Sequence, residues 1–163
     1  MYDSNNHLTL RLVIKTDEAL LYNWATDPEV RKWSFGKAPI SLNEHKSWFH
    51  KKFNDSNVLI WIFEDHNSPA GMVRLEKKDK TILLNYLISS ESRGKKLASK
   101  MLKLAMNEVA EYWQNIKVFA YTVPENISSI KSLEKAGFTL ESSSNIKNCY
   151  IYNKNDRIGA TLG

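Results

Sequence analysis

The sequence contains few of the residues that mark a secreted, membrane-spanning or irregular protein. It has one cysteine, Cys149, so an internal disulfide framework and a cysteine-based zinc site are both excluded. Four prolines and six glycines in 163 residues are few, and regular elements are therefore expected over most of the chain. The longest apolar runs, such as Val58–Phe63, are too short to span a bilayer. No charged-then-apolar leader opens the sequence, and a cytoplasmic protein without membrane contact is expected.

The composition is that of an ordinary globular domain. Hydrophobic residues make up 42% of the chain and charged residues 25%, which favours one domain, expected over residues 8–153 and followed by a polar tail at 154–163. The net charge of +5 suggests an anionic partner. The lysines are scattered and no recognised reader motif is present, so nucleic-acid binding is not expected.

Helix signals dominate the first third of the chain. Alternating apolar residues predict a strand over Leu8–Ile14 with Leu8, Leu10, Leu12 and Ile14 on one buried face. Thr16 is expected to cap a helix that runs to about Ala25, and Asp27-Pro28 to open a short helical turn through Trp33. The pattern Ser41-x-x-Glu44 is a capping box, which predicts a helix to about Phe53.

The remaining two thirds alternate between strand and helix patterns. Strands are expected at Val58–Glu64, Ala70–Glu76, Thr81–Ile88, Ile116–Thr122, Phe138–Glu141 and Cys149–Asn153, with helices at Lys96 to about Trp113 and at Ile127–Ala136. Gly137 is the expected C-cap of the last helix. The order of elements predicts an α/β (α+β) fold with a mixed sheet.

The segment from strand Thr81–Ile88 through loop Ser89–Lys95 into the next helix is the most informative. Unpaired backbone N–H groups and the positive end of a helix make such a turn an anion site, and Arg93, Lys95 and Lys96 add three positive charges. The alternative is a basic helix start exposed to solvent. Basic residues there oppose the helix dipole, so they are mildly unfavourable without an anion.

Two motifs carry a resemblance to a known family. The residues Arg93-Gly94-Lys95-Lys96-Leu97-Ala98 resemble the acyl-coenzyme A loop, Arg/Gln-x-x-Gly-x-Gly/Ala, of the GCN5-related N-acetyltransferases (GNAT). The run from Asn126 to Gly137-Phe138 resembles the family's second signature. The resemblance covers residues 8–153 and implies a single-domain fold: a mostly antiparallel sheet of about seven strands with a splayed central pair, flanked by about four helices.

The sequence departs from the family pattern at two positions. Lys96 stands where the family has its first loop glycine, and it is expected to keep a helical backbone with its side chain turned away or toward a phosphate. Leu133 stands where many members carry a tyrosine that protonates the departing thiolate. Members that resemble the ribosomal-protein N-terminal acetyltransferases also lack that tyrosine.

The resemblance implies acetyl-CoA as co-substrate and no metal. The cofactor would lie between Thr81–Ile88 and Ile116–Thr122. Its pantetheine would follow Tyr86, Leu87 and Ile88, its diphosphate would be held by Arg93, Gly94, Lys95, Lys96, Leu97 and Ala98, and Asn126 and Ser129 would contact its arm. Asn126 is equally suited to be the N-cap of its own helix.

The implied chemistry is direct attack of a neutral amine on the thioester, which requires no cysteine nucleophile. A strand amide near Leu87 or Ile88 would stabilise the charge on the carbonyl oxygen. Glu76 and Glu44 are candidate bases. Ser132, Tyr121, Tyr150 and Tyr152 are the candidate acids, and proton transfer through ordered water is the alternative to all of them.

The acceptor side is expected in the first third of the chain. It resembles acetyltransferases of nucleotide-linked amino sugars, which implies Phe35, His45 and Arg74 as substrate-binding residues. Core packing is the competing interpretation of Trp24, Trp48 and Phe49. Three other functions stay open: acetylation of protein N-termini, acetylation of polyamines or other small amines, and a non-catalytic module that binds coenzyme A. A monomer or homodimer is expected.

Overall fold

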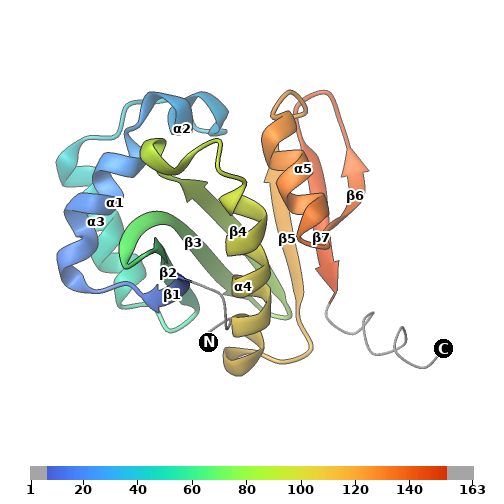
Figure 1. Cartoon of the computed structure of the whole chain (residues 1–163), viewed down its shortest axis with the longest axis horizontal. Helices are drawn as coiled ribbons and strands as arrows, with labels where there is room; N and C mark the ends of the chain where they lie inside the picture. The colour runs from blue at the N-terminus through green and yellow to red at the C-terminus, as the bar shows by residue number, and fades with distance from the viewer. Residues whose placement is uncertain (1–6, 154–163) are drawn as a thin grey trace.

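A computed structural model describes residues 7–153, and the predicted tail at 154–163 lies outside them (Figure 1). The strands are β1 (Leu8–Leu12), β2 (Val58–Asp65), β3 (Ser68–Lys78), β4 (Thr81–Ile88), β5 (Lys117–Thr122), β6 (Thr139–Ser143) and β7 (Asn148–Asn153). The helices are α1 (Glu18–Ala25), α2 (Pro28–Trp33), α3 (Leu42–Phe53), α4 (Leu97–Tyr112) and α5 (Ile127–Lys135), with 3-10 turns at Lys15–Asp17 and Ser90–Ser92.

The seven strands form one sheet in the order β1-β2-β3-β4-β5-β7-β6. Five neighbouring pairs are antiparallel, and β4 with β5 is the parallel pair at the centre. This confirms the predicted mixed, mostly antiparallel sheet. A parallel pair needs a long crossover, and α4 provides it between β4 and β5.

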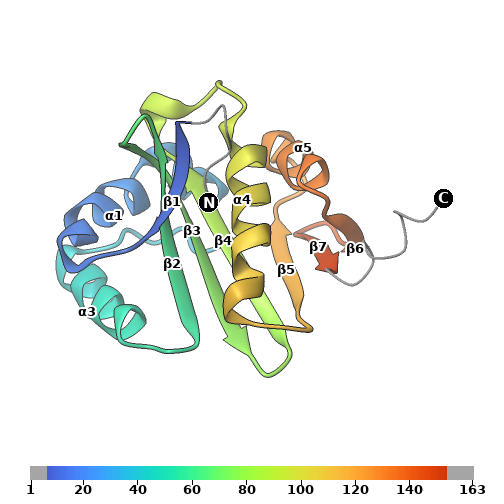
Figure 2. The same cartoon turned by 60° about the horizontal axis from the view of Figure 1, so that its bottom comes forward.

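Alternating apolar residues give the sheet two separate cores. On β2, Trp61 and Phe63 face the side covered by α4 and α5, whereas Ile60 and Ile62 face the side covered by α1 and α3. Figure 2 shows α4 lying along the sheet, with α1 and α3 on its far side. The first cluster of buried side chains packs α4 and α5 against the sheet. The smaller second cluster, which includes Trp24 and Phe49, packs α1 and α3 against its other face.

The long helix and the capped helix form as the sequence indicates. Helix α4 buries the predicted stripe, with Met101, Ala105 and Val109 all 1% exposed or less. The capping box of α3 is present: Ser41 Oγ accepts a hydrogen bond from Glu44 N at 3.2 Å, and Glu44 Oε2 accepts one from Ser41 N at 2.8 Å. Among residues 7–153, no helix is long and apolar enough to cross a membrane.

Several expectations at element ends were wrong. Thr16 does not cap α1; the Asp17 carboxylate accepts hydrogen bonds from Ile14 N and the Arg11 guanidinium instead. Strand β1 ends at Leu12, so Leu12 and Ile14 are exposed rather than buried. The short turn predicted from Asp27-Pro28 through Trp33 forms as α2, which brings the helices of the described chain to five.

Candidate active site

The central parallel pair separates part-way along its length. β4 pairs with β5 from Thr81 to Leu84, opposite Lys117 to Ala120, and the pairing stops there. On its other side β4 stays paired with β3 as far as Ile88. Four residues of β4 therefore have one edge that no strand occupies, which is the splayed pair that the family resemblance implied.

The free edge carries unpaired backbone groups that can be assigned. Ser89 N donates to Ala70 O of β3 at 2.8 Å. Amides of a strand alternate in direction, so the N–H of Leu87 also points to β3, while those of Tyr86 and Ile88 point into the gap beside β5. Of the two predicted oxyanion donors, the geometry therefore favours Ile88 over Leu87.

A cavity of about 690 Å³ occupies the gap. It is lined by the free end of β4, the end of β5, the start of α5, the start of α4, and α2 with the loop that follows it. The predicted site residues that line it are Tyr86, Leu87, Ile88, Arg93, Ala98, Asn126, Ser129, Ser132, Tyr121 and Phe35. Segments far apart in the sequence thus meet at one place.

The loop before α4 has the backbone shape of an anion cradle. Gly94 and Lys96 both have positive φ, 75° and 58°. Lys96 is the N-cap of α4 and no side chain caps that helix, so the first N–H groups of the helix have no side-chain acceptor. The expectation of a helical Lys96 was wrong, because the turn requires the left-handed conformation that the family glycine adopts easily.

Arg93 connects this loop to the opposite wall of the cavity. Its Nη2 lies 3.3 Å from Asp27 Oδ1, and the Asp27 carboxylate also caps α2 by accepting hydrogen bonds from Glu29 N and Val30 N. These hydrogen bonds, which outweigh the desolvation that acts in the opposite direction, hold the pKa of Asp27 below its usual range. The Arg93 side chain is about a third exposed, so it remains accessible to an anion at the loop.

The start of α5 forms the third wall. Asn126 Oδ1 caps the helix by accepting a hydrogen bond from Ser129 N at 3.2 Å, and its side-chain NH₂ group is left for another partner. The Tyr86 hydroxyl lies 2.5 Å from Ser129 Oγ, which ties α5 to β4 across the gap. Burial raises the pKa of Tyr86 to about 12, so its phenol stays protonated at neutral pH.

A buried hydroxyl on β5 completes the cavity wall. Thr122 is 4% exposed and lines the cavity, and its Oγ1 has no hydrogen-bond partner among the described residues. A buried hydroxyl without a hydrogen-bond partner costs free energy, so Thr122 Oγ1 is suited to form a hydrogen bond with a bound molecule.

Comparison with known proteins identifies the family. Residues 7–139 match the family described as Acetyltransferase (GNAT) domain. The chain belongs to the GNAT acetyltransferase family. It is 23% identical over 152 residues to an aminoglycoside N(6')-acetyltransferase type 1 from Klebsiella pneumoniae, which covers 83% of this chain and 76% of that protein.

Solved structures of the same fold confirm the architecture. The spermidine N-acetyltransferase from Vibrio cholerae, solved with CoA and spermine, aligns with a TM-score of 0.77 at 19% identity, over 89% of this chain and 93% of that one. The AAC(6')-Ib structure with ribostamycin and coenzyme A also gives 0.77 at 19% identity, over 96% and 98%. The predicted GNAT fold and the predicted N-acetyltransferase are therefore confirmed.

Of the predicted bases in this GNAT acetyltransferase, neither lines the cavity. Both carboxylate oxygens of Glu76 are engaged, Oε2 with Lys52 Nζ and Oε1 with Arg74 Nε, each at 2.9 Å. Glu44 is used in the cap of α3. Two of the predicted acids do line it: Ser132, whose hydroxyl donates to Ser128 O, and Tyr121, which is 41% exposed. Tyr150 and Tyr152 are buried in the core.

Of the predicted acceptor residues, Phe35 alone lines the cavity. His45 is 3% exposed, and its Nε2 lies 3.1 Å from Glu18 O, so it connects α3 to α1. Arg74 lies under α3 with its guanidinium 5.0 Å from the centre of the Trp48 ring. Both residues were expected at the substrate because their residue types suit binding. The face of α3 that carries His45 and the face of β3 that carries Arg74 point into the second core.

Two charged residues on α2, Glu29 and Arg31, line the cavity. Glu29 is the one carboxylate among the described lining residues, and its Oε1 accepts a hydrogen bond from Trp33 Nε1 at 2.9 Å. The Arg31 guanidinium donates to the carbonyls of Gly36 and Ala38 and so fixes the loop that carries Phe35. The available signal was the Asp27-Pro28 helix start, which places Glu29 in the first turn.

Proposed function

We propose that this GNAT acetyltransferase transfers the acetyl group of acetyl-CoA to the primary amine of a nucleotide-linked amino sugar. The observation that carries the proposal is the cavity at the splayed β4–β5 pair, which has donor-binding groups with Arg93 on one side and one carboxylate, the Arg31 guanidinium and aromatic rings on the other. The relatives with known acceptors support an amine on a small molecule.

The residues present fit the donor. The free amides of Tyr86 and Ile88 offer an extended molecule the hydrogen bonds of an added strand. The uncapped start of α4 suits a diphosphate, and Arg93 adds a positive charge beside it. Thr122, whose hydroxyl has no partner among the described residues, and Asn126, whose NH₂ group is left for another partner, line the same cavity and suit the polar groups of the pantetheine arm.

Bound acetyl-CoA supplies an acetyl thioester, whose carbon gains the amine nitrogen as the carbon–sulfur bond breaks, so the amine releases a proton and the sulfur takes one up. The Ile88 N–H is placed to donate to the oxygen that becomes negative. Glu29 is the lining carboxylate that can take the amine proton, directly or through water. Burial raises the pKa of Tyr121 above its ordinary value, so its hydroxyl is protonated and can supply the second proton.

The charge of the lining favours a neutral or anionic acceptor over a polycation. Among the described lining residues Glu29 is the one carboxylate, so no carboxylate cluster is present, and Arg31 is the one guanidinium outside the donor loop. A polyamine or a molecule with several ammonium groups needs clustered carboxylates, whereas a nucleotide diphosphate is matched by guanidinium groups. Phe35 and Trp33 add aromatic faces on which a sugar or base ring can stack.

A second candidate acceptor is an aminoglycoside. Similarity to two aminoglycoside N(6')-acetyltransferases over 83% of the chain favours it. Both candidates place the reacting amine on a sugar, and they differ in the charge of the rest of the molecule.

A substrate panel tests the proposal. Release of free coenzyme A thiol is measured with a nucleotide-linked 4-amino sugar, an aminoglycoside with a 6'-amine, spermidine and an N-terminal peptide at equal concentrations. We expect the highest kcat/KM with the nucleotide-linked sugar. A higher value for the aminoglycoside, spermidine or peptide would overturn the acceptor, and no thiol release with any amine would favour a coenzyme A-binding module.

The substitution Glu29→Gln tests the proton acceptor while keeping the size of the side chain. We expect kcat to fall by about 10²-fold, with a smaller loss at high pH, where more of the amine is already neutral. Glu44→Gln is the matched control, because it removes the same charge from a glutamate outside the cavity. Equal kcat values and equal pH profiles for Glu29→Gln and the unmodified enzyme would rule out this role.

A further inference from the structure

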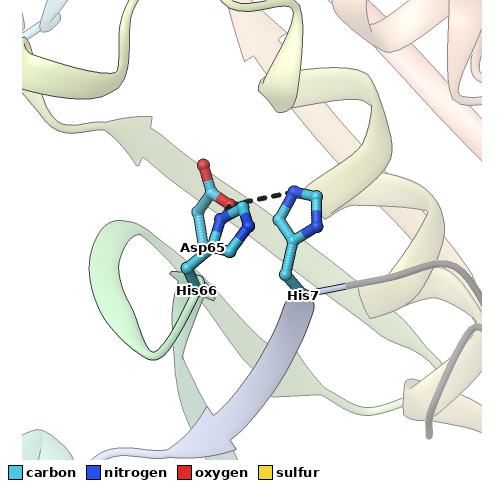
Figure 3. Close-up of side chains that lie close together, drawn as sticks. All are labelled: His7, Asp65 and His66. Atoms are coloured by element: carbon cyan, nitrogen blue, oxygen red, sulfur yellow. Dashed lines mark hydrogen bonds and ion pairs between the residues drawn. The ribbon is translucent and has the colours of Figure 1, made fainter.

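Three side chains with metal-ligating atoms meet at the start of β1, outside the cavity. They are His7, Asp65 and His66, and one ligand atom from each lies within 4.8 Å of the other two (Figure 3). We infer that these residues bind one divalent transition-metal ion, with zinc as the best match, and that the ion joins the start of β1 to the β2–β3 turn.

The backbone holds all three residues in place. Asp65 is the last residue of β2 and pairs with Leu8 of β1. His66 N donates to His7 O at 2.8 Å, so the two histidines are cross-strand neighbours. His66 opens a two-residue turn with φ of 49°, followed by Asn67 at 62°, a geometry that matches the twist of the flanking strands. The side chains therefore start from fixed positions rather than from mobile ends.

The ligand atoms already lie near the spacing that a metal requires. Asp65 Oδ1 is 2.8 Å from His66 Nδ1 and 3.2 Å from His7 Nε2. Ligands at zinc distances on a tetrahedron are about 3.3 Å apart. The two imidazole rings are stacked with centroids 3.5 Å apart and planes 19° apart. An imidazole nitrogen binds a metal in the plane of its ring, so the two rings would turn out of this stack for the three ligand atoms to meet on one ion.

The donor set decides the class of ion. Two imidazole nitrogens and one carboxylate oxygen suit zinc and its neighbours in the first transition row, whereas magnesium and calcium prefer oxygen ligands. His7 and His66 are exposed, so the ion can enter and water can fill the remaining coordination positions. None of the three residues lines the cavity, so the inferred ion has no direct part in acetyl transfer.

The test uses the full untagged chain, treated with a chelator and then titrated with zinc against a chromophoric indicator. We expect one zinc per chain and a higher Tm in its presence, because an ion that binds only the folded state stabilises it. Magnesium at the same concentration should change neither quantity.

Variants assign the site. H66N removes the imidazole but keeps a residue that tolerates positive φ, so the turn should persist, and H7Q removes the second ring without touching the turn. Each should weaken zinc binding by at least about tenfold, since even indirect partners of a metal contribute that much. H50Q is the matched control, because His50 is an exposed histidine on α3, remote from this cluster.

The outcomes separate the site from adventitious binding. If H66N and H7Q bind zinc as tightly as the unmodified chain, or if H50Q weakens binding as much as they do, the inference is wrong. Circular dichroism and unchanged acetyl transfer by H66N and H7Q would show that any lost binding comes from the lost ligands and not from misfolding.

Discussion

Lys96 is held in a conformation that suits glycine, and replacing it should stabilise the protein. Its φ of 58° and ψ of 31° lie in the left-handed region, which costs an L-residue about 1–2 kcal/mol. Glycine removes that cost but adds about 0.5–1 kcal/mol of chain entropy lost on folding. The balance is a gain of about 0.5–1 kcal/mol for Lys96→Gly, or a rise of about 1–4 °C in Tm.

Lys95→Gly is the control that isolates the backbone effect. Lys95 precedes Lys96 in the same loop and does not have a positive φ, so glycine there relieves no strain and should lower stability by about 0.5–1 kcal/mol. Each variant removes one lysine charge from the loop, so charge effects are similar in both. Urea unfolding of the two variants beside the unmodified protein measures the difference. If Lys96→Gly is destabilised as much as Lys95→Gly, the loop does not have the left-handed turn described above.

Three further predictions concern buried positions. Leu133 is fully buried, so Leu133→Tyr should overpack the core and lower the free energy of unfolding in urea by about 1–3 kcal/mol. It should also lower kcat, because the new tyrosine would not act as the acid that many family members carry there, and an increase in kcat would contradict this. A Cβ on Gly71 would lie 2.6 Å from the backbone oxygen of Leu87, so Gly71→Ala should lower Tm and weaken acetyl-CoA binding as measured by calorimetry. Gly36→Ala is the control, because nothing lies within 4 Å of its Cβ position and Tm should stay nearly unchanged. Burial lowers the pKa of His45 in the folded protein, so as pH falls the imidazole is protonated in the unfolded chain before it is protonated in the folded one. Stability should therefore fall as pH drops below about 6.5. His45→Gln should show a smaller loss between pH 7 and pH 5, and an equal loss would show that other groups cause it.

Local patterns were enough to predict most of the fold. Hydrophobic alternation and helical stripes depend on near neighbours in the chain, so the sequence could place β4, α4 and α5 within a residue or two. The strands Val58–Glu64 and Ala70–Glu76 were predicted too short, because pairing between β2 and β3 extends both to a two-residue turn at His66 and Asn67. The left-handed backbone of Lys96 was not predicted, because a lysine does not by itself indicate a positive φ.

Site residues on the cofactor side were easier to predict than those on the acceptor side. The cofactor residues lie in two contiguous motifs, so their spacing alone brings Arg93 and Asn126 to the cavity. Acceptor residues depend on which face of a helix or strand meets the cleft, and that is decided by tertiary packing. His45 and Arg74 therefore lie outside the cavity, whereas Glu29 lines it.

The two cores on opposite faces of the sheet have a consequence for how the protein can diversify. Side chains under α4 and α5 support the two helices whose starts line the cavity, while the separate cluster under α1 and α3, including Phe49 and Met72, supports the N-terminal helices. Substitutions at sites without shared partners add nearly independently in free energy. Under the proposed function, the N-terminal half can thus be remodelled for a new amine while the packing under α4 and α5 stays intact, which makes this half of the molecule the practical target for directed evolution of specificity.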